Sequence, residues 1–167
     1  MTRKQGEVTI LKPHFRQATE ADADDLARLR WDFSPDEFAA SSQSFEEFRA
    51  AFREFWVSAL ASGNWAVWLV EQGGRLVANI WVQVIHKVPR PGRFSGHNRY
   101  GYVTNLYTEP DLRGRGIGSQ LLKRAMEWAR DQELEFLVVW PAEESVAFYE
   151  RAGFRTSPDA LELQFDD

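Results

Sequence analysis

Three glycines within six residues interrupt this chain between a short apolar segment and an amphipathic one. They belong to Arg113-Gly-Arg-Gly-Ile-Gly118, which follows a predicted strand over Tyr100–Thr108. Glycine lets successive backbone N–H groups converge, and the start of a helix adds the positive end of its dipole. The segment therefore predicts a strand–loop–helix unit that binds a phosphate or pyrophosphate, with a merely flexible turn as the alternative. Apolar residues with helical spacing follow directly, at Leu121, Leu122, Ala125, Met126 and Ala129.

Two common phosphate-binding motifs do not fit this glycine-rich segment. A P-loop requires a Gly-Lys pair followed by Ser or Thr, and the nearby Lys123 is in the wrong place. The dinucleotide fingerprint requires Gly-x-Gly-x-x-Gly in a parallel unit, whereas the spacing here is Gly-x-Gly-x-Gly after strands that look antiparallel. Phosphoryl transfer from a bound nucleotide is therefore disfavoured as a function.

The composition indicates one folded domain over residues 1–167. Hydrophobic residues make up 44% of the chain and aromatic residues 14%, which is enough apolar area for a sizeable core. A formal net charge of −5 argues against nucleic acid as a partner. Because the chain has 0 Cys and 3 His, we expect no metal site and no cysteine nucleophile. Since no apolar run reaches the roughly 18 residues of a membrane span, we expect no membrane partner and a cytoplasmic location.

Capping and turn signals divide the chain into helices and strands. A hydroxyl residue followed three positions later by a carboxylate predicts helix starts at Thr19 and Ser44. Aromatic residues at helical spacing continue the second helix to Gly63. This order predicts an α/β or α+β fold around one central sheet. The remaining predictions are strands over 65–71, 75–85, 100–108 and 136–140, a long loop over 87–99, a short helix over 145–151 and a closing hairpin of 154–156 with 161–165.

Four segments of the sequence resemble the GNAT acyltransferase superfamily. The pyrophosphate loop of that family reads Arg/Gln-x-x-Gly-x-Gly/Ala, and Arg113, Gly116 and Gly118 match it. The resemblance covers most of the chain, and the four segments occur in the order of the family. The other three are Phe15–Asp22, similar to its opening, Asn105–Pro110, similar to its bulged strand, and Phe148–Phe154, similar to its Phe-Tyr-x-x-x-Gly-Phe segment.

The resemblance implies a mixed, mostly antiparallel sheet of six to seven strands, splayed between the fourth and fifth strands and flanked by about four helices. Acetyl-CoA would lie where the strands at 100–108 and 135–140 separate. The family often has an Asn for the pantetheine arm where this chain has Ala142, and Ser145 is the candidate replacement. The residues that the resemblance assigns to acetyl-CoA are Leu106, Tyr107, Thr108, Arg113, Gly114, Arg115, Gly116, Ile117, Gly118, Ser119, Ser145 and Phe148.

The resemblance also implies the chemistry of the site. A backbone N–H near Leu106 would polarise the thioester carbonyl as an oxyanion donor. An amine would then attack directly, without a covalent enzyme intermediate, which agrees with the absence of cysteine. Tyr149 would protonate the departing CoA thiolate as general acid. The alternative for Tyr149 is an ordinary tyrosine in the core.

The general base of the family is missing at its usual place. Many members carry a Glu or Asp on the third central strand, where this chain has Thr104 and Asn105. A chain of water molecules without a single base is one alternative. The other candidates are Glu109, which is the nearest carboxylate but is expected to be solvated at the loop entrance, and Tyr102, His86 and His97, which could relay a proton through water.

The acceptor is expected to contact an aromatic and acidic segment over residues 30–38. Trp31, Phe33 and Asn105 are the candidate contacts, suited to a cationic amine with an apolar body. Rings that close the core beside a solvated acidic rim are the alternative. We therefore expect an N-acetyltransferase that acts on a primary amine of a small molecule or peptide and, like many members of the family, forms a homodimer. A non-catalytic acyl-CoA-binding module is the alternative, because the usual base is absent.

Overall fold

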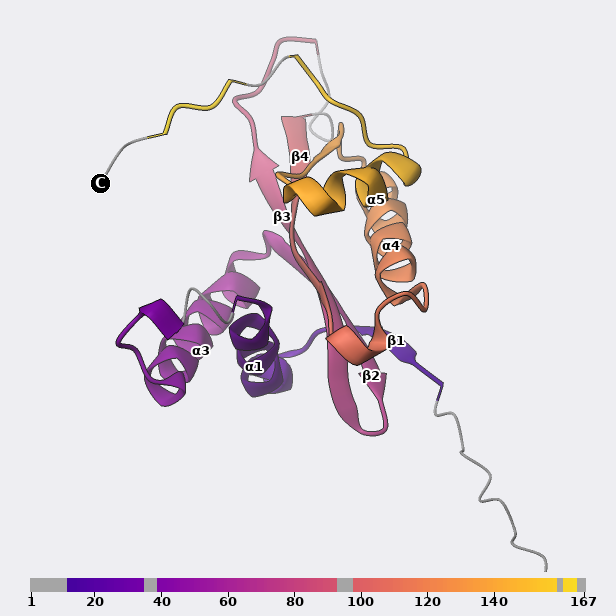
Figure 1. The fold of residues 1–167 in the computed structure, drawn as a ribbon. Coiled ribbons are helices and arrows are strands. Elements are labelled where there is room, and N and C mark those ends of the chain that lie inside the picture. The colour runs from indigo at the N-terminus through magenta and orange to yellow at the C-terminus, as the bar shows by residue number, and fades with distance from the viewer. Residues whose placement is uncertain (1–11, 35–38, 93–97, 159–160, 165–167) are drawn as a thin grey trace, which may run out of the picture.

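A five-stranded sheet forms the centre of the computed structural model, which describes residues 12–34, 39–92, 98–158 and 161–164 (Figure 1). The sheet order follows the chain order. The first three neighbouring pairs are antiparallel and the last is parallel, as predicted for a mixed, mostly antiparallel sheet. The strands are β1 (His14–Gln17), β2 (Trp65–Gln72), β3 (Arg75–His86), β4 (Arg99–Thr108) and β5 (Leu137–Val138).

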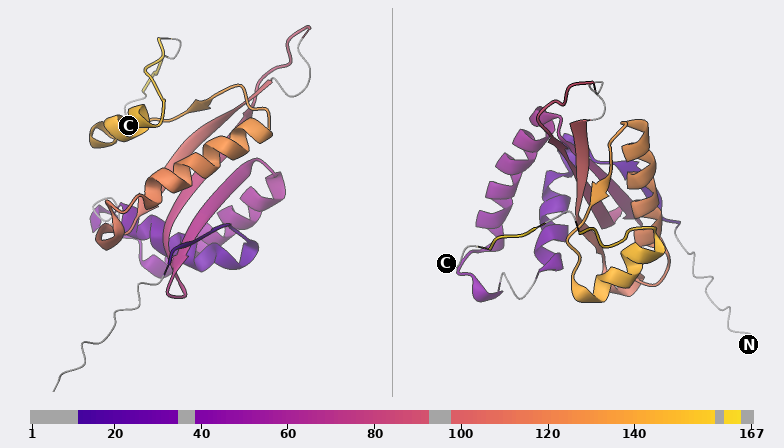
Figure 2. Two further views of the ribbon diagram at one scale, coloured as in Figure 1. Left: turned by 90° about the vertical axis from the view of Figure 1, so that its right-hand side faces the viewer. Right: turned by 90° about the horizontal axis from the view of Figure 1, so that it is seen from above.

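Amphipathic helices cover both faces of the sheet (Figure 1). Helices α1 (Ala23–Phe33) and α3 (Phe45–Ser62) lie on one face. Helix α4 (Ile117–Asp131) and the short helix α5 (Val146–Arg151) lie on the other. The view from above in Figure 2 shows the resulting three layers. Each sheet face therefore carries its own apolar cluster, with Trp56 and Trp81 on the α1/α3 side and Leu121 on the α4 side.

The predicted capping signals are confirmed at both early helices. Ser44 Oγ accepts a hydrogen bond from the Glu47 N–H, and the Glu47 carboxylate accepts one from the Ser44 N–H, at 3.3 and 2.8 Å. Gly63 ends α3 in the left-handed conformation, with φ of 65°. Thr19 and Asp22 form a second capping box, which starts a short 3-10 turn ahead of α1.

Strand β5 contacts β4 over only two residue pairs, so the two strands separate early. Gly101 pairs with Leu137 and Tyr102 with Val138. A Cβ at Gly101 would lie 2.5 Å from Leu137 Cδ2 and 2.9 Å from Val82 Cγ1, so only glycine permits this approach. Beyond Tyr102, β4 has no partner strand on its β5 side within the described residues, which gives the predicted splay between the fourth and fifth strands.

Three sequence predictions at the sheet margins are wrong. The closing hairpin is absent, because the described residues 154–158 and 161–164 form no strand and Leu161 is 99% exposed. The predicted strand over 136–140 shortens to β5, and the Phe136 and Trp140 side chains at its ends are exposed. The four-residue strand β1 was missed because it contains a single apolar residue, Phe15. The described sheet therefore has five strands rather than six to seven.

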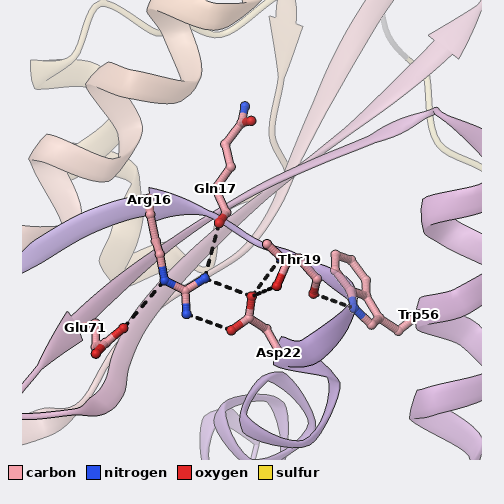
Figure 3. A network of polar contacts seen from close by, with 6 residues as sticks. All are labelled: Arg16, Gln17, Thr19, Asp22, Trp56 and Glu71. Atoms are coloured by element: carbon pink, nitrogen blue, oxygen red, sulfur yellow. Dashed lines mark hydrogen bonds and ion pairs between the residues drawn. The ribbon is translucent and has the colours of Figure 1, made fainter.

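An ion pair between β1 and the start of α1 fixes the N-terminal side of the sheet (Figure 3). Arg16 donates two hydrogen bonds to the Asp22 carboxylate, at 2.8 and 2.7 Å, and lies 3.5 Å from Glu71. The Thr19 N–H and hydroxyl also donate to Asp22, and Trp56 Nε1 donates to the Thr19 carbonyl. The Asp22 side chain is only 8% exposed, so these bonds compensate a buried charge.

We expect Asp22→Asn to lower the unfolding free energy by about 2 kcal/mol at neutral pH, since it breaks hydrogen bonds to a charged group. Burial opposes ionisation of Asp22, but the bonds from Arg16 and Thr19 outweigh it and hold its pKa below 3.8. The contribution is therefore present above about pH 4 and is lost as pH falls through the folded pKa. Urea unfolding from pH 3 to 7 measures it. Asp24→Asn, in an exposed pair with Arg53, is the control with a small effect, and equal losses in both variants would contradict the prediction.

Candidate functional site

A bulge in β4 lies near the middle of the sheet, at Asn105 and Leu106, shortly after the last pair of β4 with β5 at Tyr102. Asn79 on β3 pairs with Tyr107, whereas Trp81 pairs with Thr104. One β3 residue therefore faces two β4 residues, Asn105 and Leu106. Asn105 has φ of 50°, a left-handed conformation that Asn tolerates better than most residues. The bulge interrupts the regular ladder next to Leu106, as predicted from the segment before the glycine-rich loop.

A buried amide on β3 holds this bulge in place. Asn79 is fully buried, and its Oδ1 accepts hydrogen bonds from Trp81 Nε1 at 2.8 Å and from Asn105 Nδ2 at 3.1 Å. Asn79 Nδ2 and Asn105 Oδ1 are buried without a hydrogen-bond partner in the part of the chain that the structure describes. The sequence analysis missed Asn79, although a single amide inside an otherwise apolar strand is a visible signal for a buried polar role.

A cavity of about 350 Å³, which we call the aromatic cavity, opens beside the bulge on the α1/α3 face. Two of the predicted acceptor contacts, Phe33 and Asn105, line it. Trp31 does not, because its ring packs against Phe45 and Phe48 at centroid distances of 5.4 and 5.5 Å. The acidic positions 36 and 37 and Phe38 lie outside the described residues. The full lining is Arg30, Phe33, Phe48, Phe52, Phe55, Trp65, Trp81, Thr104 and Asn105.

The glycine-rich loop turns sharply into α4, as predicted. Gly114 and Gly116 have φ of 73° and 77°, conformations that side-chain-bearing residues adopt only with strain. Gly116 caps α4 without a side chain, so the N–H groups of the first helical turn, Ile117–Ser119, have no capping acceptor. This leaves a set of backbone donors for an anion. The Arg113 side chain folds back instead, donating to the Thr108 carbonyl at 3.0 Å.

Residues assigned to acetyl-CoA from β4, α4 and α5 come together beside this loop. A Cβ at Gly118 would lie 3.8 Å from both the Phe148 ring and Thr108 Oγ1. Ser119 and Phe148 also line a second cavity of about 260 Å³ between α4 and α5. Ser145, at the start of α5, makes no capping hydrogen bond with its side chain and does not line this cavity.

Tyr149 is buried on the α4 face of the sheet. It is 8% exposed, and its ring contacts Phe148 and Phe154 at centroid distances of 5.1 and 5.5 Å. Burial raises the pKa of Tyr149 to about 12, and the nearby Tyr102 contributes to the increase. Its hydroxyl makes no hydrogen bond to any residue that the structure describes. The phenol is therefore neutral and carries its proton at every ordinary pH.

The structure assigns Glu109 a different role from the solvated loop residue that was expected. Its side chain is only 13% exposed, and Oε1 accepts from Arg28 at 2.9 Å and from Arg75 at 2.5 Å. Glu109 is therefore tied into two ion pairs, with Arg28 of α1 and Arg75 of β3, rather than solvated at the loop entrance.

The two histidines named as relays are not placed at the bulge. His86 lies five residues beyond Trp81 along β3, about 17 Å away, and its Nε2 is 3.2 Å from Asn64 Oδ1. His97 lies outside the described residues. Tyr102 remains a candidate relay because it lies close enough to Tyr149 to affect its pKa.

Neither a metal site nor a membrane span is found in the described parts of the chain. No three His, Asp or Glu side chains there gather as metal ligands. No helix within the described ranges has the length and apolar character needed to cross a bilayer.

Comparisons with known proteins agree with this geometry. The model of the acetyltransferase (GNAT) family matches residues 23–154. A glucosamine 6-phosphate N-acetyltransferase of Trypanosoma brucei brucei is 29% identical over 90 residues, which cover 54% of this chain and 58% of that relative, so the chain spans little more than half of its length. A crystal structure of a GCN5-related N-acetyltransferase from Ralstonia eutropha is 26% identical with a TM-score of 0.71, covering 92% of this chain and 99% of the other.

A second solved structure has the same fold. It is a predicted acetyltransferase from Clostridium acetobutylicum, crystallised with acetyl-CoA, with 24% identity and a TM-score of 0.76. The alignment covers 92% of this chain and 96% of that one. Because the family model spans most of the sequence, including the bulge, the glycine-rich loop and Tyr149, the chain belongs to the acetyltransferase (GNAT) family.

Proposed function

We propose that this protein transfers the acetyl group of acetyl-CoA to a primary amine of a small molecule or peptide. The observation that carries the proposal is the bulged, splayed edge of β4 beside the glycine turn over 113–118. The edge offers unpaired strand backbone and the turn offers N–H donors. Together they suit a long ligand with amides at one end and phosphates at the other.

Acetyl-CoA would use both features. Its pantetheine amides would pair with the backbone of 106–108, where β4 has no described strand on its β5 side. Its pyrophosphate would accept from N–H groups of the loop and the first turn of α4. Ser119 and Phe148 would contact the ligand along the second cavity, between α4 and α5. Arg113 would also brace the loop through its hydrogen bond to the Thr108 carbonyl.

The chemistry would be a direct attack. The amine nitrogen forms a bond to the thioester carbonyl carbon, and the Leu106 N–H donates to the oxygen as negative charge develops there. The C–S bond then breaks, and the thiolate takes a proton from Tyr149. The ammonium proton leaves through water, with Tyr102 as the candidate relay. The raised pKa keeps the Tyr149 phenol protonated before the transfer, and the phenolate would then regain a proton from water.

The proposal predicts that a library of primary amines contains members that accelerate release of free CoA thiol from acetyl-CoA well above the rate without amine. A thiol-reactive dye measures the rate at which free CoA is released. We also expect acetyl-CoA, but not ATP, to raise the temperature at which the protein unfolds. A non-catalytic acyl-CoA-binding module would show the protection with no amine-dependent release, and protection by ATP alone would favour nucleotide chemistry.

Tyr149→Phe is expected to lower kcat about 100-fold with little change in the KM for acetyl-CoA. The ring keeps its packing against Phe148 and Phe154, and the missing hydroxyl had no hydrogen bond to a described residue, so the fold should be retained. Steady-state kinetics with the best amine measures the effect. Tyr100→Phe, a ring stacked on Phe136 far along β4, is the control. An unchanged kcat in Tyr149→Phe would identify Tyr149 as a core tyrosine only.

Gly116→Ala should raise the KM for acetyl-CoA about tenfold, the equivalent of one lost hydrogen bond to a charged group. The new Cβ would project into the open space where the donors converge. Gly63→Ala is a matched control, because Gly63 is also left-handed with open space around it but lies at the end of α3. Both variants should lose about 1 kcal/mol of stability. Equal KM values in the two variants would exclude a role for the loop.

A further inference from the structure

The aromatic cavity is built to bury a flat apolar group. Six of its nine lining residues are Phe or Trp, and they come from α1, α3, β2 and β3. The Phe33 and Phe55 side chains remain 41% and 44% exposed at its mouth. Ring centroids of Phe52, Phe55 and Trp65 lie 5.7–6.1 Å from that of Trp81, so the walls are packed against one another and preformed. Its volume, about 350 Å³, is that of a small-ligand site.

The polar end of the cavity lies at the bulge. Thr104 and Asn105 line the cavity and immediately precede Leu106, whose N–H is the proposed oxyanion donor. A ligand whose ring lies among the aromatic side chains would therefore direct its polar end toward the acetyl group. The cavity therefore matches an arylalkylamine, whose ring would lie at the aromatic end and whose nitrogen would lie at the polar end.

The charge distribution disfavours polar acceptors. Among the described lining residues, Arg30 is the only charged one, and no carboxylate is present. Its guanidinium donates to Ser34 and lies 5.4 Å from the Phe33 ring centroid. A sugar with several hydroxyls, or a compound with several ammonium groups, would lose hydration here without matching partners. One amine on an aromatic body avoids most of that loss, because its ring meets the aromatic walls and its nitrogen meets Thr104 and Asn105.

We infer that the acceptor is a primary amine with an aromatic body, bound with its ring in the aromatic cavity and its nitrogen at Thr104 and Asn105. This inference rests on the proposed acetyl transfer, because only that reaction makes the bound amine an acceptor. The recognition itself depends only on the cavity.

Two measurements test the inference separately from the transfer reaction. The first is calorimetric titration of 2-phenylethylamine, tryptamine, ethylamine and glucosamine 6-phosphate into the full chain saturated with CoA, which has no acetyl group to transfer. The second is amine-dependent thiol release from acetyl-CoA. We expect 2-phenylethylamine to exceed ethylamine about 10- to 100-fold in affinity and in kcat/KM, the value of burying one ring.

Substitutions in the wall of the aromatic cavity test where the amine binds. Phe33→Ala should weaken 2-phenylethylamine binding roughly fivefold and leave ethylamine unchanged. Phe55→Ala is the second cavity variant, in case Phe33→Ala disturbs α1. Phe136→Ala removes an equally exposed ring on a distant surface and should bind as the unaltered protein does.

The outcomes separate the two proposals. Binding of aromatic amines that weakens only in the cavity variants supports the inference even if no acetyl transfer occurs, in which case the proposed function fails alone. Turnover of ethylamine or glucosamine 6-phosphate at least as efficient as that of 2-phenylethylamine overturns the inference and leaves the proposed function intact. Equal effects of Phe33→Ala, Phe55→Ala and Phe136→Ala overturn it as well.

Discussion

The buried amide of Asn79 is the interaction on which the site depends. Its Oδ1 accepts hydrogen bonds from two side chains, Trp81 on its own strand and Asn105 on the next. Because the buried Oδ1 of Asn79 would otherwise lose the hydrogen bond it makes to Asn105 Nδ2, the fold favours keeping Asn105 within reach of it. That constraint stabilises the left-handed residue in β4 and fixes the orientation of the Trp81 ring. One hydrogen-bonded side chain thus contacts both the bulge, at Asn105, and the wall of the aromatic cavity, at Trp81.

Local signals predicted the helices and the glycine turn because each is determined by neighbours in sequence. Capping boxes at Thr19 and Ser44 and the left-handed stop at Gly63 need only a few adjacent residues. The margins of the sheet depend on distant contacts instead. Strand β1 forms through its antiparallel pairing with β2. Strand β5 is limited to the two residues that pair with β4 at Gly101 and Tyr102. No local pattern carries that information.

The site was predictable to a similar degree. The turn at Gly114 and Gly116 was predictable from the spacing of the glycines, and Phe33 of the aromatic segment 30–38 lies in a cavity wall. The pairing of Glu109 was missed because its partners are distant along the chain: Arg28 lies 81 positions from it and Arg75 lies 34 positions from it. The pairing of Glu109 joins α1, β3 and the entrance of the glycine-rich loop.

The three-layer arrangement seen in Figure 2 also separates the two halves of the site by face. The glycine-rich loop, α4 and α5 belong to one face, whereas the cavity walls belong mainly to α1 and α3 on the other. Substitutions in the cavity walls can change its shape and polarity without contacting the loop. A lineage with this architecture can therefore diversify the compounds it recognises while its loop stays the same, and paralogues would diverge first in the N-terminal helices.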